Sequence, residues 1–208
     1  MPPGWMTRSR GLTPVKPHRA FDPRVVGSLE TTTWVTYYRR EWIPFLRAAV
    51  RVIRHGFGLP WRRTLQGAWL VLRANQQWAP FPNNDPEGAR RTMQRFYELV
   101  RRRHGESFDP GVAARLEVEW WRVHREHQHN GRMTDGDGPI IDALAALYAY
   151  VFGVDEAAVR PAGEQRAEAM RYSDRWVREG CSLASPLIEL ERAALIRSYA
   201  ALLAAVHR

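Results

Sequence analysis

One ten-residue pattern occurs twice in the chain, 87 positions apart, and it constrains the fold more than any other feature. The first copy begins Phe21-Asp22-Pro23 and the second begins Phe108-Asp109-Pro110. The copies also share a Val, a Leu-Glu pair and a following Trp at matching positions. Seven identities in one register are more than chance would give. We therefore predict two related units, repeat 1 over about 21–105 and repeat 2 over about 108–208, packed as equivalent parts of one domain.

Both units have the pattern of a helical protein. Each opens with an aspartate before a proline, which places a capping side chain ahead of the first helical position. Apolar residues recur at steps of 3 and 4, and no alternating strand pattern occurs. The predicted helical segments are 23–42, 43–57, 61–78, 86–104, 110–129, 139–152, 164–179 and 186–208. The expected fold is all-α, a single up-and-down helical bundle with pseudo-twofold character, preceded by a disordered basic arm over 1–20.

The duplicated helices carry the residues that point to chemistry. In helix 110–129, the spacing of Glu117, Trp121, His124 and Gln128 stacks them on one face. The same slots of helix 23–42 hold Glu30, Trp34, Tyr37 and Glu41. If duplication preserved the packing, the two helices lie side by side in a shared core with Trp34 and Trp121 buried.

Carboxylates from facing helices, together with a histidine, are how helical bundles build non-haem iron or manganese sites. The first hypothesis is therefore a metal-dependent enzyme, an oxidase or oxygenase that acts on a small organic substrate. Its metal ligands are Glu30, Glu117 and His124, and its further catalytic groups are Tyr37 and Glu41. The alternative for Glu30 and Glu117 is structural. They are then core carboxylates that pair with Arg or accept hydrogen bonds from Tyr and Trp.

Charge is distributed unevenly along the chain. Residues 1–104 carry a net charge of +13 and residues 105–208 a net charge of −4, which together give the overall +9. Such asymmetry indicates an anionic partner for the first half, either a membrane surface or nucleic acid. It also fits attraction between the two halves, or between two protomers of a homodimer.

A basic segment with interleaved aromatic residues supports the second hypothesis, which is a non-enzymatic protein that docks on an anionic surface. This segment contains Phe45, Ile53, Phe57, Trp61 and Trp69. A basic amphipathic stretch with Trp is typical of proteins that lie on an anionic bilayer or follow a nucleic-acid backbone. The residues predicted to contact the anionic surface are Arg47, Arg51, Arg54, Arg62 and Arg63. The alternative is that these arginines only form a solvated face over an apolar stripe that packs in the core.

Other features narrow the class of protein. Cys181 is the single cysteine, which excludes an intrachain disulfide and a cysteine-based zinc site. The expected location is the cytoplasm, with the protein either free or peripheral to the membrane, because neither a signal peptide nor a transmembrane segment is recognisable. The chain lacks the glycine-rich nucleotide motifs and the G-x-S-x-G nucleophile motif.

Two segments resemble a group of uncharacterised actinobacterial proteins. They are Val118-Glu-Trp-Trp-Arg-Val-His-Arg125 and Arg73-Ala-Asn-Gln-Gln-Trp-Ala-Pro80. The resemblance covers most of residues 20–208. It implies an all-helical protein and implies no activity.

Overall fold

The computed structural model describes residues 16–130 and 136–208, and over these ranges the fold is all-α, as predicted. The described chain contains eight α-helices and a short 3-10 turn, and it contains no strand. The 3-10 turn spans Pro17–Arg19 (η1). The helices are α1 (Pro23–Tyr38), α2 (Trp42–Phe57), α3 (Trp61–Trp78), α4 (Pro86–His104), α5 (Pro110–Asn130), α6 (Gly138–Phe152), α7 (Glu156–Arg178) and α8 (Leu187–Val206).

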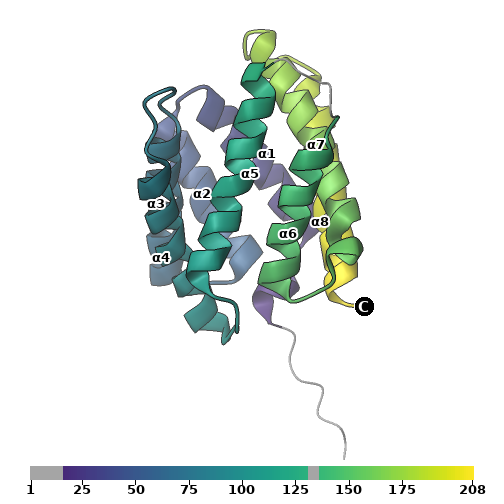
Figure 1. Cartoon of the computed structure of the whole chain (residues 1–208). Helices are drawn as coiled ribbons and strands as arrows, with labels where there is room; N and C mark the ends of the chain where they lie inside the picture. The colour runs from purple at the N-terminus through teal and green to yellow at the C-terminus, as the bar shows by residue number, and fades with distance from the viewer. Residues whose placement is uncertain (1–15, 131–135) are drawn as a thin grey trace, which may run out of the picture.

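The helices form a closed ring (Figure 1). Each helix packs against its neighbours in the sequence, and α8 closes the ring by packing against α1. Short connections make successive helices run in opposite directions, so the C-terminal ends of α1, α3, α5 and α7 share one end of the ring. The first predicted unit supplies α1–α4 and the second supplies α5–α8, so each unit makes half of the ring. The duplication itself stays a prediction.

The ring corrects the predicted placement of the duplicated helices. We expected helices 23–42 and 110–129 to lie side by side, but α1 packs against α2 and α8, whereas α5 packs against α4 and α6. Equivalent helices that are four places apart in a ring of eight must lie on opposite sides of it. Their repeated faces therefore look toward each other across the interior, where Gln128 of α5 donates to the hydroxyl of Tyr38 of α1 at 2.9 Å.

Two helix boundaries were misplaced by the sequence-based prediction, each of them near a proline. Helix 23–42 ends at Tyr38, and α2 then begins at Trp42 after a turn in which Arg40 has a left-handed φ of 59°. Pro44 lies in the first turn of α2, where its missing N–H has no partner to lose. Helix 164–179 in fact begins at Glu156, because α7 accommodates Pro161.

The helix starts follow the predicted capping chemistry. The side chain of Asp22 accepts a hydrogen bond from the backbone N–H of Arg24, at 2.8 Å. Asp109 caps α5 in the same way through the N–H of Val112, also at 2.8 Å. The repeated Asp-Pro dipeptide therefore starts the same kind of helix at both of its positions.

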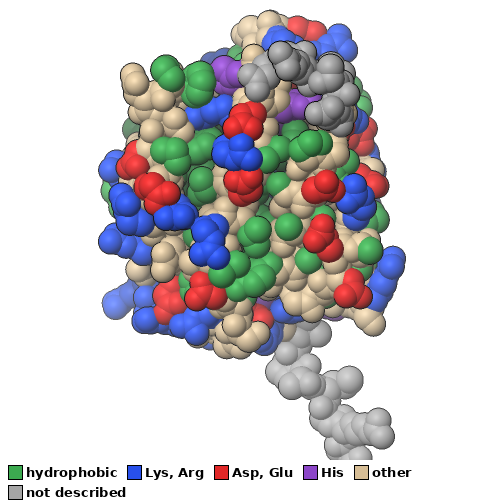
Figure 2. All heavy atoms as spheres, in the orientation of Figure 1, with side chains coloured by type: hydrophobic (Ala, Val, Ile, Leu, Met, Phe, Trp, Pro, Cys, Tyr) green, Lys and Arg blue, Asp and Glu red, His purple; other side chains and the backbone are tan. Residues whose placement is uncertain are grey.

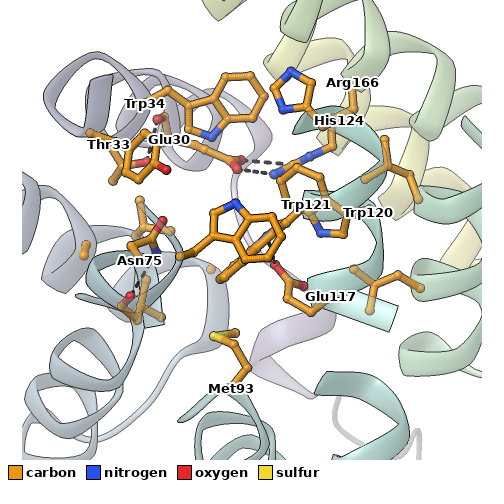
Figure 3. A pocket seen from close by; sticks show the side chains of 18 of the residues that line it. Glu30, Thr33, Trp34, Asn75, Met93, Glu117, Trp120, Trp121, His124 and Arg166 are labelled. Carbon is orange, nitrogen blue, oxygen red and sulfur yellow. Dashed lines mark hydrogen bonds and ion pairs between the residues drawn. The ribbon is translucent and has the colours of Figure 1, made fainter. Parts of the chain in front are cut away.

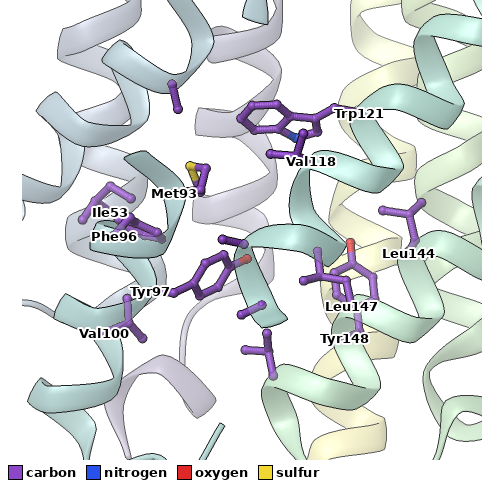
Figure 4. Close-up of a cluster of buried hydrophobic side chains, with 14 of the residues drawn as sticks. Ile53, Met93, Phe96, Tyr97, Val100, Val118, Trp121, Leu144, Leu147 and Tyr148 are labelled. Atoms are coloured by element: carbon purple, nitrogen blue, oxygen red, sulfur yellow. The ribbon is translucent and has the colours of Figure 1, made fainter. Parts of the chain in front are cut away.

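The core lies between the helices and surrounds a central space. Figure 4 shows one part of it, in which Phe96 and Tyr97 of α4 face Trp121 of α5 and Tyr148 of α6. Trp121 is buried as predicted, whereas Trp34 is only partly buried. Many of these side chains are aromatic, and they line a cavity at the centre of the ring.

The floor of the ring is closed by residues that we had assigned to the disordered arm. The rest of that arm, residues 1–15, lies outside the described residues. His18 is only 2% exposed, and its ring lies 4.3 Å from the ring of His104 and 6.2 Å from that of Phe152. Its Nε2 atom is 3.0 Å from Oε1 of Glu106, without the alignment of a hydrogen bond. Burial lowers the pKa of His18 to about 4, so the imidazole that closes this end of the ring is neutral.

Candidate functional site: an aromatic cavity inside the helical ring

A cavity of about 610 Å³ occupies the centre of the ring. This volume is within the range of pockets that bind small organic molecules. Most of the lining is apolar or aromatic, including Trp34, Trp78, Trp120 and Trp121. The lining residues that are exposed to solvent lie where α1, α3, α5 and α7 end, so the cavity opens at that end of the ring. These residues are Arg40, Phe81, His129 and Arg178.

The predicted face of α5 forms one wall of the cavity. Glu117, Trp121, His124 and Gln128 all line it, as their helical spacing indicated. From the first repeat, Glu30, Trp34 and Tyr37 line it as well. The two repeated faces therefore contribute to one site across the interior, although their helices are not neighbours in the ring.

The centre of the cavity holds a buried ion pair (Figure 3). Nη1 of Arg166 donates to Oε2 of Glu30 at 3.2 Å, and Nη2 contacts the other carboxylate oxygen. The hydroxyl of Tyr199 also donates to Glu30. The guanidinium lies 5.5 Å from the ring centroids of both Trp34 and Trp120, within cation–π range. Two aromatic rings and a carboxylate thus compensate the buried charge of Arg166.

Arg166 keeps one donor that no side chain uses. The side chain is 7% exposed, and its Nε–H makes no hydrogen bond to a described residue. The hydroxyl of Tyr148, another buried lining group, also has no partner there. A buried donor without a partner costs free energy, so both groups favour a ligand that carries an acceptor oxygen.

Glu117 has a different environment from its repeat equivalent, Glu30. The hydroxyl of Tyr97 donates to its Oε2 at 2.7 Å, and the indole N–H of Trp121 donates to its Oε1 at 3.2 Å. Burial raises the pKa of Glu117, while the hydrogen bond from Tyr97 and the charge of Arg166 act in the opposite direction. Both glutamates thus match the structural alternative from the sequence, since one pairs with Arg and the other accepts bonds from Tyr and Trp.

His124 belongs to a chain of hydrogen bonds that ends at Tyr38. Its Nε2 lies 3.1 and 3.2 Å from the two carboxylate oxygens of Asp174. Oδ1 of Asp174 also accepts a 2.5 Å hydrogen bond from the amide of Gln128, which donates in turn to Tyr38 at 2.9 Å. A carboxylate can only accept, so Nε2 of His124 must carry the proton. Its Nδ1 then has a free lone pair, is bonded to no described residue and is not sealed from the cavity.

Arginine side chains surround the mouth of the cavity. Arg125 stacks 4.3 Å above the ring of Trp78 and donates to the carbonyl oxygen of that residue at 2.8 Å. Arg40 donates to the carbonyl of Ala79 at 3.0 Å and lies over the ring of Tyr37. With Arg178, these groups make the entrance cationic, which favours ligands with a negative or electron-rich polar group.

Glu41 does not belong to this site. It precedes α2 and forms an ion pair with Arg39 at 2.7 Å, on the surface and outside the cavity lining. Its helical spacing from Tyr37 had predicted a shared face, but α1 ends at Tyr38, before that spacing reaches Glu41. A catalytic role for Glu41 therefore has no support from its position.

The predicted iron or manganese ligands do not form a metal site here. Among the described residues, no group of three His, Cys, Asp or Glu side chains is arranged to hold a metal ion. The three predicted ligands each have another partner, since Glu30 pairs with Arg166, Glu117 binds Tyr97 and Trp121, and His124 binds Asp174. A cation at Glu30 would also have to displace or tolerate the positive charge of Arg166.

The predicted anionic-surface contacts lie elsewhere. Arg47, Arg51, Arg54, Arg62 and Arg63 are all exposed on α2 and α3, and none of them lines the cavity.

Comparisons with protein-family models, with curated proteins and with solved structures found no match to this chain. The resemblance to the actinobacterial group therefore stays a prediction. Within the described residues, no helix is both long enough and apolar enough to cross a membrane.

Proposed function

We propose that this protein binds a small, mostly apolar organic molecule in its central cavity and that His124 transfers a proton to or from that molecule. One observation carries the proposal. Three polar atoms that bond to no described residue belong to side chains that line a large aromatic cavity, namely Nε of Arg166, the hydroxyl of Tyr148 and Nδ1 of His124. An apolar pocket with a few convergent polar groups is the usual form of a small-molecule site.

The arrangement favours proton abstraction from a carbon next to an oxygen-bearing group. Asp174 orients the imidazole, and its negative charge stabilises the imidazolium that forms when Nδ1 takes a proton. The electron pair released from the substrate would move to the oxygen that Arg166 and Tyr148 bind. Fixed donors at that oxygen stabilise the negative charge that develops on it. Return of the proton at a second carbon completes an isomerisation without any further reactant.

The side chains of His124 and Arg166 line the same part of the cavity. Trp120 lies one helical turn before His124 on α5, and its ring stacks on Arg166. Figure 3 shows His124, Arg166 and Trp34 around the same space. The predicted small organic substrate is therefore retained in this proposal, whereas the metal is replaced by an acid–base pair.

Titration with an anilinonaphthalene sulfonate tests the binding step. This probe combines apolar rings with an anionic group, as the cavity and its cationic mouth require. We expect saturable binding of one probe per chain, followed by energy transfer from the Trp residues of the wall. In Asn75→Trp the new ring fills the cavity, and we expect the affinity to fall by at least about tenfold, which corresponds to about 1.4 kcal/mol.

Asn75 suits this test because its side chain lines the cavity and donates only to Val71 of its own helix. Asn75→Ala is the matched control and should bind the probe as well as the original chain does. Circular dichroism and the thermal midpoint show whether each variant is folded. Equal affinity in a folded Asn75→Trp variant, or several weak sites per chain, would contradict binding in the cavity.

A further inference from the structure

The outer face of α2 and α3 combines positive charge with exposed apolar side chains. Residues 42–84 contain six Arg and neither Asp nor Glu. All six are exposed, and within the described chain none of them forms an ion pair. They are Arg47, Arg51, Arg54, Arg62, Arg63 and Arg73. Figure 2 shows Lys and Arg side chains gathered along the left edge of the molecule, which is the side of α3 and α4.

Large apolar side chains stand among these arginines. Trp61, Leu65 and Trp69 follow one another at single-turn spacing on α3 and are 58%, 47% and 54% exposed. On the adjacent α2, Ile43 is 69% exposed. The guanidinium of Arg54 lies 5.9 Å from the ring centroid of Trp61, so the two helices present one continuous surface. We call this surface, formed by the six arginines with Ile43, Trp61, Leu65 and Trp69, the α2–α3 face.

We propose that the α2–α3 face docks the protein on the surface of an anionic lipid bilayer. Tryptophan and long aliphatic side chains occupy the boundary between head groups and acyl chains, where their apolar parts leave water. Arginines at the same level bind lipid phosphates and are attracted by the negative surface potential. Both features occur together on this face, and a docked bilayer would satisfy both.

The same features disfavour the other occupants. A second copy related by twofold symmetry would bring the face against itself and place Arg opposite Arg. Nucleic acid would satisfy the charge, and Trp can stack on bases. The exposed aliphatic side chains of Ile43 and Leu65, however, gain nothing from a phosphate backbone. The bilayer is the one partner that uses every component of the face.

The docking proposal is independent of the proposed function, although the two surfaces adjoin. The N-terminal end of α2 and the C-terminal end of α3 lie at the mouth of the cavity, beside Arg40 and the exposed ring of Phe81. An apolar ligand released from the bilayer would therefore meet the entrance close to the docking face.

Vesicle flotation of the full chain tests the proposal. We expect binding to vesicles that contain phosphatidylglycerol, weaker binding when salt is raised, and little binding to pure phosphatidylcholine. The triple variant Arg47→Glu, Arg51→Glu, Arg54→Glu should lose at least about tenfold in vesicle affinity, since each charge contributes separately to the attraction. Trp61→Ser with Trp69→Ser should lose a similar factor while every arginine stays in place.

The matched control reverses three exposed arginines of α4 instead, as Arg91→Glu, Arg95→Glu, Arg103→Glu, and changes the net charge equally. It should keep most of its vesicle binding. Equal loss in the two triple variants, or no binding at low salt, would overturn the proposal. So would unchanged vesicle binding in the Trp variant with loss of duplex DNA binding, or a dimer that only the Trp variant dissociates.

Discussion

Arg166→Met should lower the free energy of unfolding by about 3–5 kcal/mol, which is the usual cost of removing one partner from a buried ion pair. The variant leaves the carboxylate of Glu30 in the middle of the ring with only the Tyr199 hydroxyl to compensate it. It also removes the cation that stacks on Trp34 and Trp120. Urea denaturation, followed by circular dichroism, measures the loss.

The double variant Arg166→Met, Glu30→Gln is the control for this prediction. It removes both charges, so it should recover a large part of the stability that the single variant loses. An Arg166→Met variant as stable as the original chain would show that Glu30 does not depend on this cation. Equal losses in the single and double variants would assign the effect to packing.

Glu191→Gln should stabilise the protein at neutral pH. Glu191 is fully buried, and neither of its carboxyl oxygens makes a well-aligned hydrogen bond to a described residue. Burial raises its pKa from 4.5 to about 9, with a further contribution from the negative charge of Glu30. The folded protein therefore keeps a proton on Glu191 that the unfolded chain releases above pH 4.5.

The sign and size of the effect follow from proton linkage. Because the folded state binds more protons between pH 4.5 and 9, stability falls as pH rises through that interval. Each pH unit costs about 1.4 kcal/mol, so the loss approaches roughly 3 kcal/mol at pH 7. Glutamine is neutral in both the folded and the unfolded state, so it removes this pH-dependent loss. The gain is reduced by the cost of burying its amide group at this position.

Urea denaturation at pH 5 and pH 8 tests the Glu191 prediction. The original chain and Glu191→Gln should have similar stability at pH 5, and the variant should be clearly more stable at pH 8. Glu189→Gln is the matched control, because Glu189 is exposed on the same helix beside Arg192 and should change little at either pH. A Glu191→Gln variant that is no more stable than the original chain at pH 8 would show that Glu191 is not protonated in the folded protein at that pH.

Much of the fold and one wall of the site follow from local sequence patterns. Aspartate–proline starts, apolar spacing and glycine ends specify the helices, and the one-turn spacing on α5 correctly placed Glu117, Trp121 and His124 on one face. These features depend on neighbours within a few residues, which a single sequence displays directly.

The partners of those residues could not be predicted in the same way. Arg166 and Asp174 both lie on α7, and Arg166 is 136 positions from Glu30. Only the closure of the ring brings α7 to the cavity, and no local pattern encodes that closure. One signal was available, since Arg166 lies on the face of α7 that also carries Ala162, Ala169 and Ser173. An arginine within a stripe of small residues indicates a buried charge that needs a partner.

The prediction of a metal site arose because the sequence does not reveal the partners of Glu30, Glu117 and His124. A glutamate and a histidine on one helical face suit a metal ion, an ion pair or a hydrogen-bonded dyad equally well. The deciding residues are those of the facing helices. Here they are Arg166 for Glu30, Tyr97 for Glu117 and Asp174 for His124, which favours acid–base chemistry.

The protonation of His124 tests the central claim that this cavity contains an oriented base. Nitrogen-15 NMR of the imidazole, recorded at about pH 8.5, distinguishes the two neutral forms. We predict that His124 carries its proton on Nε2 and leaves Nδ1 unprotonated, and that Asp174→Asn gives a mixture of the two forms. An imidazole with its proton on Nδ1 in the original chain, or a tautomer that Asp174→Asn leaves unchanged, would contradict the claim.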